Sequence, residues 1–187
     1  MKIVYVLILI LVCFGCNLFE PREAEPPDPP ADWHAFPTTH VMCLENLIFA
    51  HNYRENMWNY GNILSEQFLF IFDRQDVSDF TLPTTWNRIS ETVMLRNAHS
   101  QAGASGINLE LSLIENQVDD VRANMAWIFR NYSLKVDSFH DNDYQIFSGR
   151  MELYLEIEHG LWVIREWSDF RDGNIWTWGR MKNAFSV

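Results

Sequence analysis

Hydrophobic and polar residues alternate along the chain between Met125 and Phe170, and this alternation is the strongest structural signal in the sequence. Successive side chains of a strand point to opposite faces of a sheet, so the pattern predicts three antiparallel strands joined by two short turns. Residues 128–137 and 147–157 form the first two strands. His159-Gly160 forms a two-residue turn into the third, since glycine tolerates the positive φ of such turns. We expect this sheet to be the centre of the fold.

Two charged residues fall on the apolar face of this predicted sheet. The turn places Leu153 opposite Glu166, and keeping the apolar faces of the first two strands together places Arg130 beside Leu153. Arg130 and Glu166 then lie roughly 10 Å apart at the backbone, on the strands either side of Leu153. A charged pair on the core side of a sheet either lines a cavity or forms a buried structural pair. Arg130 and Glu166 are therefore the leading site candidates.

A β-bulge in the third strand is the alternative geometry. One extra residue near Val163 to Arg165 would turn Trp167 and Asp169 toward the core and Glu166 away from it. Without a bulge, Tyr154, Arg165 and Trp167 lie together on the outer face, where they form a possible homodimer surface. The alternation alone leaves both geometries open.

The remaining predicted elements mostly precede this sheet. Thr38 or Thr39 caps a first helix that ends near Tyr53, and Thr84 or Thr85 caps another that ends near His99. This later helix carries an apolar stripe at Trp86, Ile89, Val93 and Met94. The other expected elements are a short helix at 55–64, strands at 68–72 and 107–113, loops at 73–83 and 115–124, and an aperiodic aromatic tail at 174–185.

The first fifteen residues have the parts of a secretory signal peptide: Lys2, an apolar run, and Gly15 directly before Cys16. This end resembles a bacterial lipobox, in which Cys16 carries the lipid; ordinary secretion and an uncleaved anchor are the alternatives. Residues 16–35, rich in proline and acidic residues, are expected to form an extended tether from a membrane to a folded domain at 36–187. The resemblance implies a bacterial cell-envelope location. Asn17 does not match the aspartate retention signal of some bacteria, which favours the outer membrane.

Composition excludes several kinds of partner and site. The formal charge of −11 argues against nucleic-acid binding, since phosphates would be repelled. Cys43 is the only cysteine in the predicted domain, so neither an internal disulfide nor a zinc cluster is expected, and its apolar helical context predicts a buried thiol. The histidines lack the spacing of a metal site, and the sequence has no phosphate-binding glycine loop or nucleophile elbow. We expect neither a metal nor a cofactor.

The predicted order of elements, helix, helix, strand, helix and then four antiparallel strands, resembles the NTF2-like α+β cone, the superfamily that includes ketosteroid isomerases and SnoaL-like cyclases. The segment 161–169 is similar to the final strand of that fold, and 178–182 resembles the tails of bacterial envelope lipoproteins of this type. The resemblance implies N-terminal helices packed on a curved, mostly antiparallel sheet that encloses a pocket. The residues expected to line the pocket are Arg130, Tyr132, Leu153, Glu166, Trp58 and Phe70.

Three functions are compatible with these features. We expect first a non-catalytic cell-envelope lipoprotein whose domain binds a small apolar ligand or a protein partner. The alternative is an isomerase, dehydratase or cyclase with acid–base residues in the pocket, although the base, tyrosine and protonated acid of ketosteroid isomerase cannot be placed residue by residue. The third is a structural homodimer. A roomy cavity with an intact polar pair favours binding or catalysis, whereas a filled cone favours assembly.

Overall fold

The computed structural model describes residues 33–140 and 142–186. The signal peptide, the lipidated Cys16 and nearly all of the tether predicted from the sequence lie outside the described residues. The described residues form one compact unit. Within the described part of the chain, no helix is both long enough and apolar enough to span a membrane.

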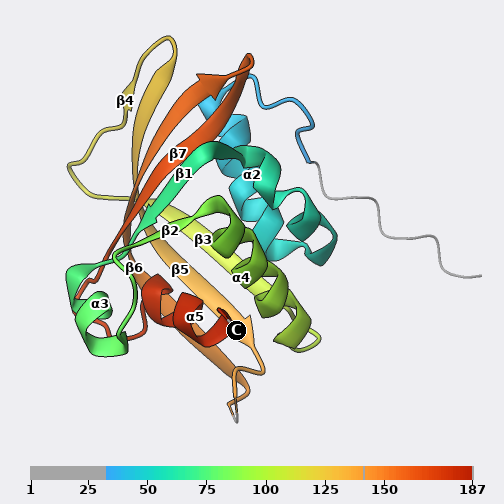
Figure 1. Cartoon of the computed structure of the whole chain (residues 1–187), viewed down its shortest axis with the longest axis vertical. Helices are drawn as coiled ribbons and strands as arrows, with labels where there is room; N and C mark the ends of the chain where they lie inside the picture. Colours follow the sequence, from blue (N-terminus) through green and yellow to red (C-terminus); the bar gives the residue numbers. More distant parts are fainter. Residues whose placement is uncertain (1–32, 141, 187) are drawn as a thin grey trace, which may run out of the picture. The chain divides into compact units, whose positions relative to one another are not determined.

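The described residues form four α-helices, two 3-10 helices and a seven-stranded sheet (Figure 1). The strands follow the order β2-β1-β7-β6-β5-β3, with β4 paired to β5; β1 runs parallel to β7, and all other pairs are antiparallel. The elements are α2 (His40–Asn52), η2 (Arg54–Trp58), η3 (Tyr60–Ile63), β1 (Leu64–Ile71), α3 (Arg74–Phe80), β2 (Thr85–Asn87), α4 (Arg88–Gln101), β3 (Ile107–Leu113), β4 (Asp120–Val121), β5 (Met125–Asp137), β6 (Tyr144–Glu158), β7 (Leu161–Phe170) and α5 (Trp178–Phe185).

The sheet is strongly curved and remains open, and the helices pack on its concave side (Figure 1). This arrangement confirms the predicted α+β class. The start of α2 is also as predicted, since the Thr39 side chain accepts a hydrogen bond from the Met42 N–H at 3.2 Å. Cys43 is fully buried in this helix, and burial raises the pKa of its thiol.

Three local predictions are wrong. The loop expected at 73–83 contains α3, which begins after Asp73, whose side chain accepts from the Gln75 N–H. Helix α4 is capped by Asn87 rather than by a threonine, because 85–87 pair with β1 as a short strand. The tail expected to be aperiodic contains α5, which is capped by Thr177. Helix α3 has seven residues and α5 has eight, so each spans only about two turns, too few for a periodic pattern to stand out in the sequence.

The hairpin between β6 and β7 begins in the predicted register and then shifts by one residue. His159 and Gly160 have φ values of 52° and 82°, as a two-residue turn requires, and Leu155 lies opposite Ile164. Beyond this pair a β-bulge leaves Arg165 unpaired, so that Leu153 faces Trp167 instead of Glu166. The predicted row of Arg130, Leu153 and Glu166 is therefore wrong, and the bulged alternative is confirmed.

The β5–β6 register also differs from the prediction, by two residues. Arg130 lies opposite Met151 rather than Leu153, and Tyr132 lies opposite Gly149. Ladder pairing ends at Asp137 and Tyr144, so the connecting turn is longer than expected. An even shift keeps each side chain on its predicted face, so the inner and outer faces of these two strands are as predicted.

Candidate functional site beneath the C-terminal helix

Helix α5 lies against the inner face of the curved sheet, in the region where the sequence predicted a pocket (Figure 1). Its Trp178, Met181 and Lys182 side chains are fully buried. Trp178 is the centre of this packing: its ring lies 4.4 Å from Trp167, 4.8 Å from Tyr132 and 5.3 Å from His51, between centroids. The cone is thus filled by the chain itself.

The first turn of α5 engages two polar side chains of the sheet. The Trp178 backbone N–H donates to the Tyr132 hydroxyl at 2.9 Å, and the Gly179 N–H donates to Asp169 Oδ2 at 3.2 Å. Position 179 requires glycine, because a Cβ there would lie 2.5 Å from Asp76 Oδ2. The backbone of α5 therefore occupies the hydrogen-bonding positions that a ligand of Tyr132 and Asp169 would use.

The strand end that leads into α5 is fixed by an ion-pair network on α3. The Arg171 guanidinium binds the buried Asp76 carboxylate, and its Nη1 donates to Asp79 Oδ2 at 2.7 Å. The Thr177 hydroxyl donates to Asp76 Oδ2 at 2.5 Å and its oxygen accepts from the Arg180 N–H. Asp76 thus links α3, the end of β7 and the cap of α5, and α3 supports the position of the helix that fills the cone.

Deeper in the fold, Lys182 forms an ion pair with Glu91 of α4, and both side chains have no exposed surface. The Tyr60 hydroxyl donates to the same carboxylate oxygen, Glu91 Oε1, at 2.9 Å. The ammonium of Lys182 also lies 4.0 Å from the centroid of Phe70 and 5.2 Å from that of Trp167. This buried pair is the strongest electrostatic feature of the inner face.

Burial shifts the proton affinities of the groups around α5. Desolvation raises the pKa of Asp169 to about 7, with repulsion from Asp76 in the same direction and hydrogen bonding from Tyr132 and Gly179 against it. Desolvation lowers the pKa of His51 to about 3, although its Nδ1 bonds the Leu47 carbonyl at 2.8 Å. These groups are consequently held in their uncharged forms more strongly than in water.

Desolvation also lowers the pKa of Lys182, while the Glu91 charge raises it. Several buried polar atoms around α5 have no hydrogen-bond partner among the described residues: Glu91 Oε2, Asp169 Oδ1, His51 Nε2, Trp167 Nε1 and Trp178 Nε1. Such atoms are rare in folded proteins and mark this region as one shaped by more than packing.

The six residues predicted to line a pocket are not brought together. Tyr132, Leu153 and Phe70 are buried on the inner face. Tyr132 contacts Trp178 of α5, and Phe70 contacts Lys182 of α5. Glu166 is turned to the outer face by the bulge. Trp58 is 62% exposed beneath Arg96, whose guanidinium lies 4.7 Å from its ring.

Arg130, the other leading candidate, forms a different ion pair. Its guanidinium makes two 2.7 Å hydrogen bonds to Asp119, which lies in the loop between β3 and β4. Burial alone would raise the pKa of Asp119, but hydrogen bonds from Arg130 and the Phe129 N–H lower it below its usual value. The partner is Asp119 rather than Glu166 because the bulge removes Glu166 from the inner face.

The sequence reasoning missed Glu91, Lys182 and Asp169 as site residues. For Glu91 a signal existed, because it lies three and four positions before the buried Met94 and Leu95 and so shares their helix face. The predicted stripe through Ile89 and Val93 is instead exposed, at 72% and 41%. Lys182 carries the same signal, since it lies four positions after Trp178 and three before Phe185, but the tail was expected to be aperiodic.

A separate surface cleft of about 330 Å³ lies beside the segment that enters α2. Its lining includes Trp33, His34, Arg88, Glu158 and His159. None of the six predicted pocket residues lines it. Among the described residues no group of three or more His, Cys, Asp or Glu side chains is placed to hold a metal ion.

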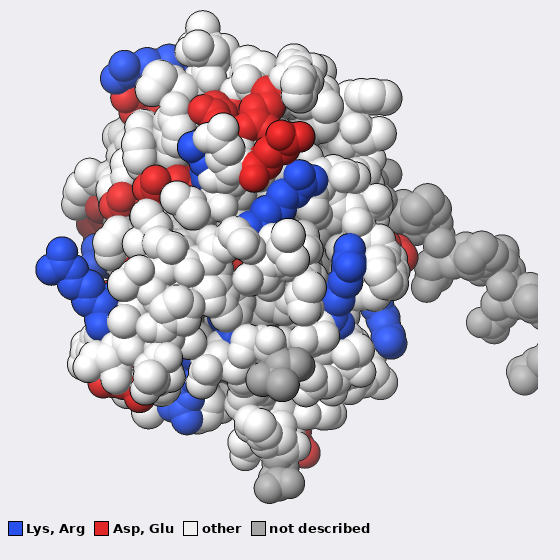
Figure 2. Space-filling model, viewed as in Figure 1, with Lys and Arg blue, Asp and Glu red and all other residues white. Residues whose placement is uncertain are grey.

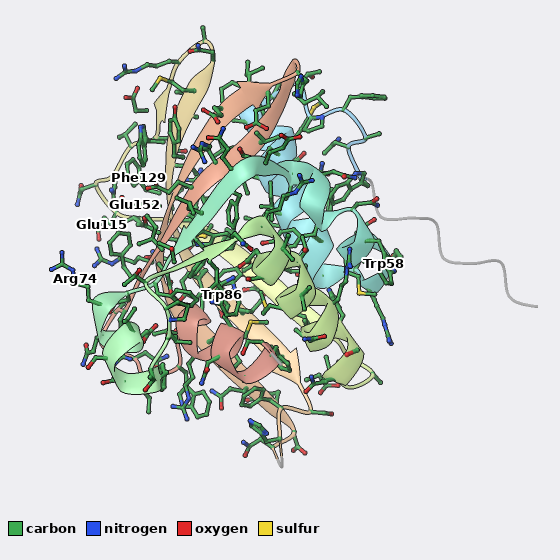
Figure 3. All side chains as sticks on the ribbon, viewed as in Figure 1. Trp58, Arg74, Trp86, Glu115, Phe129 and Glu152 are labelled. Atoms are coloured by element: carbon green, nitrogen blue, oxygen red, sulfur yellow. The ribbon has the colours of Figure 1, made fainter. Side chains whose placement is uncertain are left out.

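The outer face of the sheet carries aromatic side chains among charges. Trp127 packs against Tyr154 with 4.8 Å between ring centroids and 35° between the ring planes, and the neighbouring pair places Phe129 opposite Glu152. Figure 3 shows Phe129 and Glu152 close together on one side of the molecule, with Trp58 on the opposite side. Figure 2 shows acidic and basic side chains interspersed on the visible face. Trp167 does not belong to this outer surface, because the bulge turns it inward.

No protein-family model matches the sequence, and no curated protein matches it. An NTF2-like protein of unknown function from Pseudomonas putida KT2440 has a TM-score of 0.54 at 8% identity, over 72% of this chain and 85% of that one. An NTF-2 like protein of unknown function from Shewanella oneidensis MR-1 has a TM-score of 0.50 at 16% identity, over 69% and 93%. A conserved protein from Planctomyces limnophilus DSM 3776 has a TM-score of 0.56 at 8% identity, over 68% and 89%.

At these identities the likeness establishes the fold alone. The chain has the NTF2-like α+β fold, with helices packed on a curved, open sheet. The expectation that followed from the order of elements is confirmed for the fold.

Proposed function

We propose that this chain is a cell-envelope lipoprotein, anchored through Cys16, whose NTF2-like domain is a non-catalytic binding module. The observation that carries the proposal is the position of α5. The helix fills the inner face of the sheet, and its backbone amides bind Tyr132 and Asp169. A domain whose interior is occupied by its own chain offers its outer surface to partners.

The enzymatic alternative is an isomerase, dehydratase or cyclase that uses acid–base residues in the cone. Tyr132 and Asp169 are the groups suited to such chemistry, since the pKa of Asp169 is raised to about 7 by burial. Both are buried, and α5 bonds both. A substrate would therefore have to displace a helix anchored by a buried ion pair before it reached either group, which favours binding over catalysis.

The outer sheet face is the surface that we assign to binding, and a second copy of this chain is the partner. The packed Trp127 and Tyr154 supply half-buried aromatic area, which is typical of interface centres. Arg150, Glu152 and Glu166 lie on the same face without an ion-pair partner among the described residues. A two-fold axis through this face would place Arg150 of one copy against Glu152 and Glu166 of the other.

The test is the oligomeric state of the chain lacking residues 1–15, measured by sedimentation velocity. The wild type is expected to form a dimer, and Trp127→Arg a folded monomer, because the new charge lies within the apolar part of the interface. Trp58→Arg is the matched control, since this tryptophan is 62% exposed on the opposite side of the molecule (Figure 3). A wild type that remains monomeric at high micromolar concentration, or a Trp127→Arg variant that remains dimeric, would overturn the assignment of this face.

A further inference from the structure

The ammonium group of Lys182 lies in a box of aromatic rings. Its Nζ is 4.0 Å from the ring centroid of Phe70, 5.2 Å from Trp167, 5.6 Å from Trp178 and 5.9 Å from Trp86. The Glu91 carboxylate closes the remaining side through the ion pair. Trp86, labelled in Figure 3, is partly buried.

Aromatic faces and a carboxylate are the groups that recognise organic ammonium ions. Ring faces attract a cation most strongly when water is excluded, as it is around this fully buried lysine. The carboxylate supplies both the opposite charge and hydrogen-bond acceptors for N–H groups. Glu91 Oε2 has no partner among the described residues, although it is buried, so the carboxylate retains a free acceptor beside the ammonium.

Three of the rings and the carboxylate do not depend on α5. Phe70 lies on β1, Trp86 on β2, Trp167 on β7 and Glu91 on α4. Lys182 and Trp178 are the contributions of α5 itself. We call Phe70, Trp86, Trp167 and Glu91 the ammonium cage, for which Lys182 is the occupant supplied by the chain.

Departure of helix α5 would leave every strand ladder intact, although it would break the Lys182–Glu91 ion pair and expose Trp178. It has eight residues, belongs to no strand ladder and is the last described element. The chain before it is held at Trp176, whose carbonyl accepts from the Ser148 N–H at 2.8 Å. Release from Thr177 onward therefore breaks no strand-to-strand hydrogen bond, although it breaks the two that Trp178 and Gly179 donate to sheet side chains.

We propose that the ammonium cage is a binding site for primary alkylammonium ligands, and that such a ligand exchanges with Lys182 as α5 moves away. The ligand needs at least two N–H groups, as a primary ammonium has, because the Lys182 Nζ donates to Glu91 Oε1 and the buried Glu91 Oε2 is an acceptor without a partner among the described residues. The chain's own lysine acts as a tethered competitor, which keeps the cage closed until the ligand is abundant. The inference is independent of the proposed outer binding face.

The first experiment measures chemical rescue of Lys182→Ala by n-butylammonium chloride, with n-butanol as the uncharged probe of the same length. The melting temperature of the variant is expected to rise saturably with the ammonium and little with the alcohol. The double variant Glu91→Gln/Lys182→Ala should lose this difference, because the cage has lost its charge. If Lys182→Ala is unfolded at 25 °C, the same comparison is made on the recovery of its far-ultraviolet circular dichroism.

The second experiment measures amide hydrogen exchange of α5 in the wild type. Exchange of the α5 amides should accelerate as n-butylammonium is added, by about tenfold at ten times the Kd of the opened state. Equal rescue by alcohol and ammonium would show that the ligand only fills a cavity. No rescue would show that the ammonium cage does not bind an ammonium ligand. Rescue of the variant without faster α5 exchange in the wild type would show that the ligand does not exchange with Lys182, which would then have a structural role only. Each of these three results overturns the proposal.

Discussion

The inner and outer faces of the curved sheet differ in how their polar side chains are buried and paired. On the inner face, Glu91, Lys182 and Asp169 are buried, and each contacts a group of the chain itself. On the outer face, Arg150 and Glu152 are only partly buried or exposed and have no ion-pair partner among the described residues. The inner face therefore serves the stability of the closed domain, and the outer face retains groups for a partner.

The difference follows from solvent access. A charge without water requires a partner, whereas a charge in water is stable alone. Deleting one member of an inner pair should consequently have a large effect, and deleting one member of an outer pair a small one.

The largest expected effect comes from the inner ion pair. Glu91→Gln should lower the free energy of unfolding by about 3–5 kcal/mol, because it leaves the Lys182 ammonium buried without its counter-charge. Glu156→Gln is the outer-face control: Glu156 lies 3.4 Å from Arg165, with both side chains about one-third exposed, so its loss should cost about 1 kcal/mol or less. Urea unfolding followed by tryptophan fluorescence measures both. Similar losses for the two variants would contradict the contrast.

A smaller effect is expected from the titration of Asp169. Burial raises its pKa from the ordinary 3.8 to about 7, so the folded state binds its proton more tightly than the unfolded state does. The associated stability is present below pH 4 and is lost as the pH rises toward 7, with a slope of at most about 1.4 kcal/mol per pH unit. Asp169→Asn removes this contribution, so its stability relative to the wild type should increase between pH 4 and pH 7.

The difference between variant and wild type is the quantity to measure, because His51 acts in the opposite sense. Its pKa is lowered to about 3, so its contribution is lost as the pH falls from about 6.5, equally in both proteins. Ser168→Ala, on the neighbouring outer-face position, changes no titrating group and should follow the wild type at every pH. A parallel pair of curves for Asp169→Asn and the wild type would show that Asp169 is not held protonated.

The fold was predictable because strand alternation and turn chemistry act over short distances. The two-residue turn at His159 and Gly160 and the cap at Thr39 each depend on a few neighbouring residues. The bulge at Arg165 stayed one of two alternatives, because the contacts that Arg165 makes are distant in sequence. The Arg165 guanidinium donates to the backbone carbonyl and side-chain oxygen of Gln67 on β1, which lies beside β7.

The candidate site was less predictable than the fold. Its key groups come together only after α5 returns to the sheet, and the Lys182–Glu91 pair spans 91 positions of the sequence. A lysine in a tail expected to be aperiodic is typical of a solvated end, whereas in the structure it lies on the buried face of α5. The one-residue register shift then exchanged Glu166 for Trp167 and Asp169 on the inner face.

The claim that α5 fills the inner face can be tested most directly by amide hydrogen exchange at Trp178 and Gly179, without added ligand. Their N–H groups donate to Tyr132 and Asp169, two buried side chains of the sheet. If the helix is closed as described, the free energy of opening should be about 4 kcal/mol or more at both amides. This slows exchange roughly a thousandfold relative to unprotected amides. Exchange at the rate of the exposed Gly173 amide would contradict the account, because the inner face would then be open to solvent and to substrates.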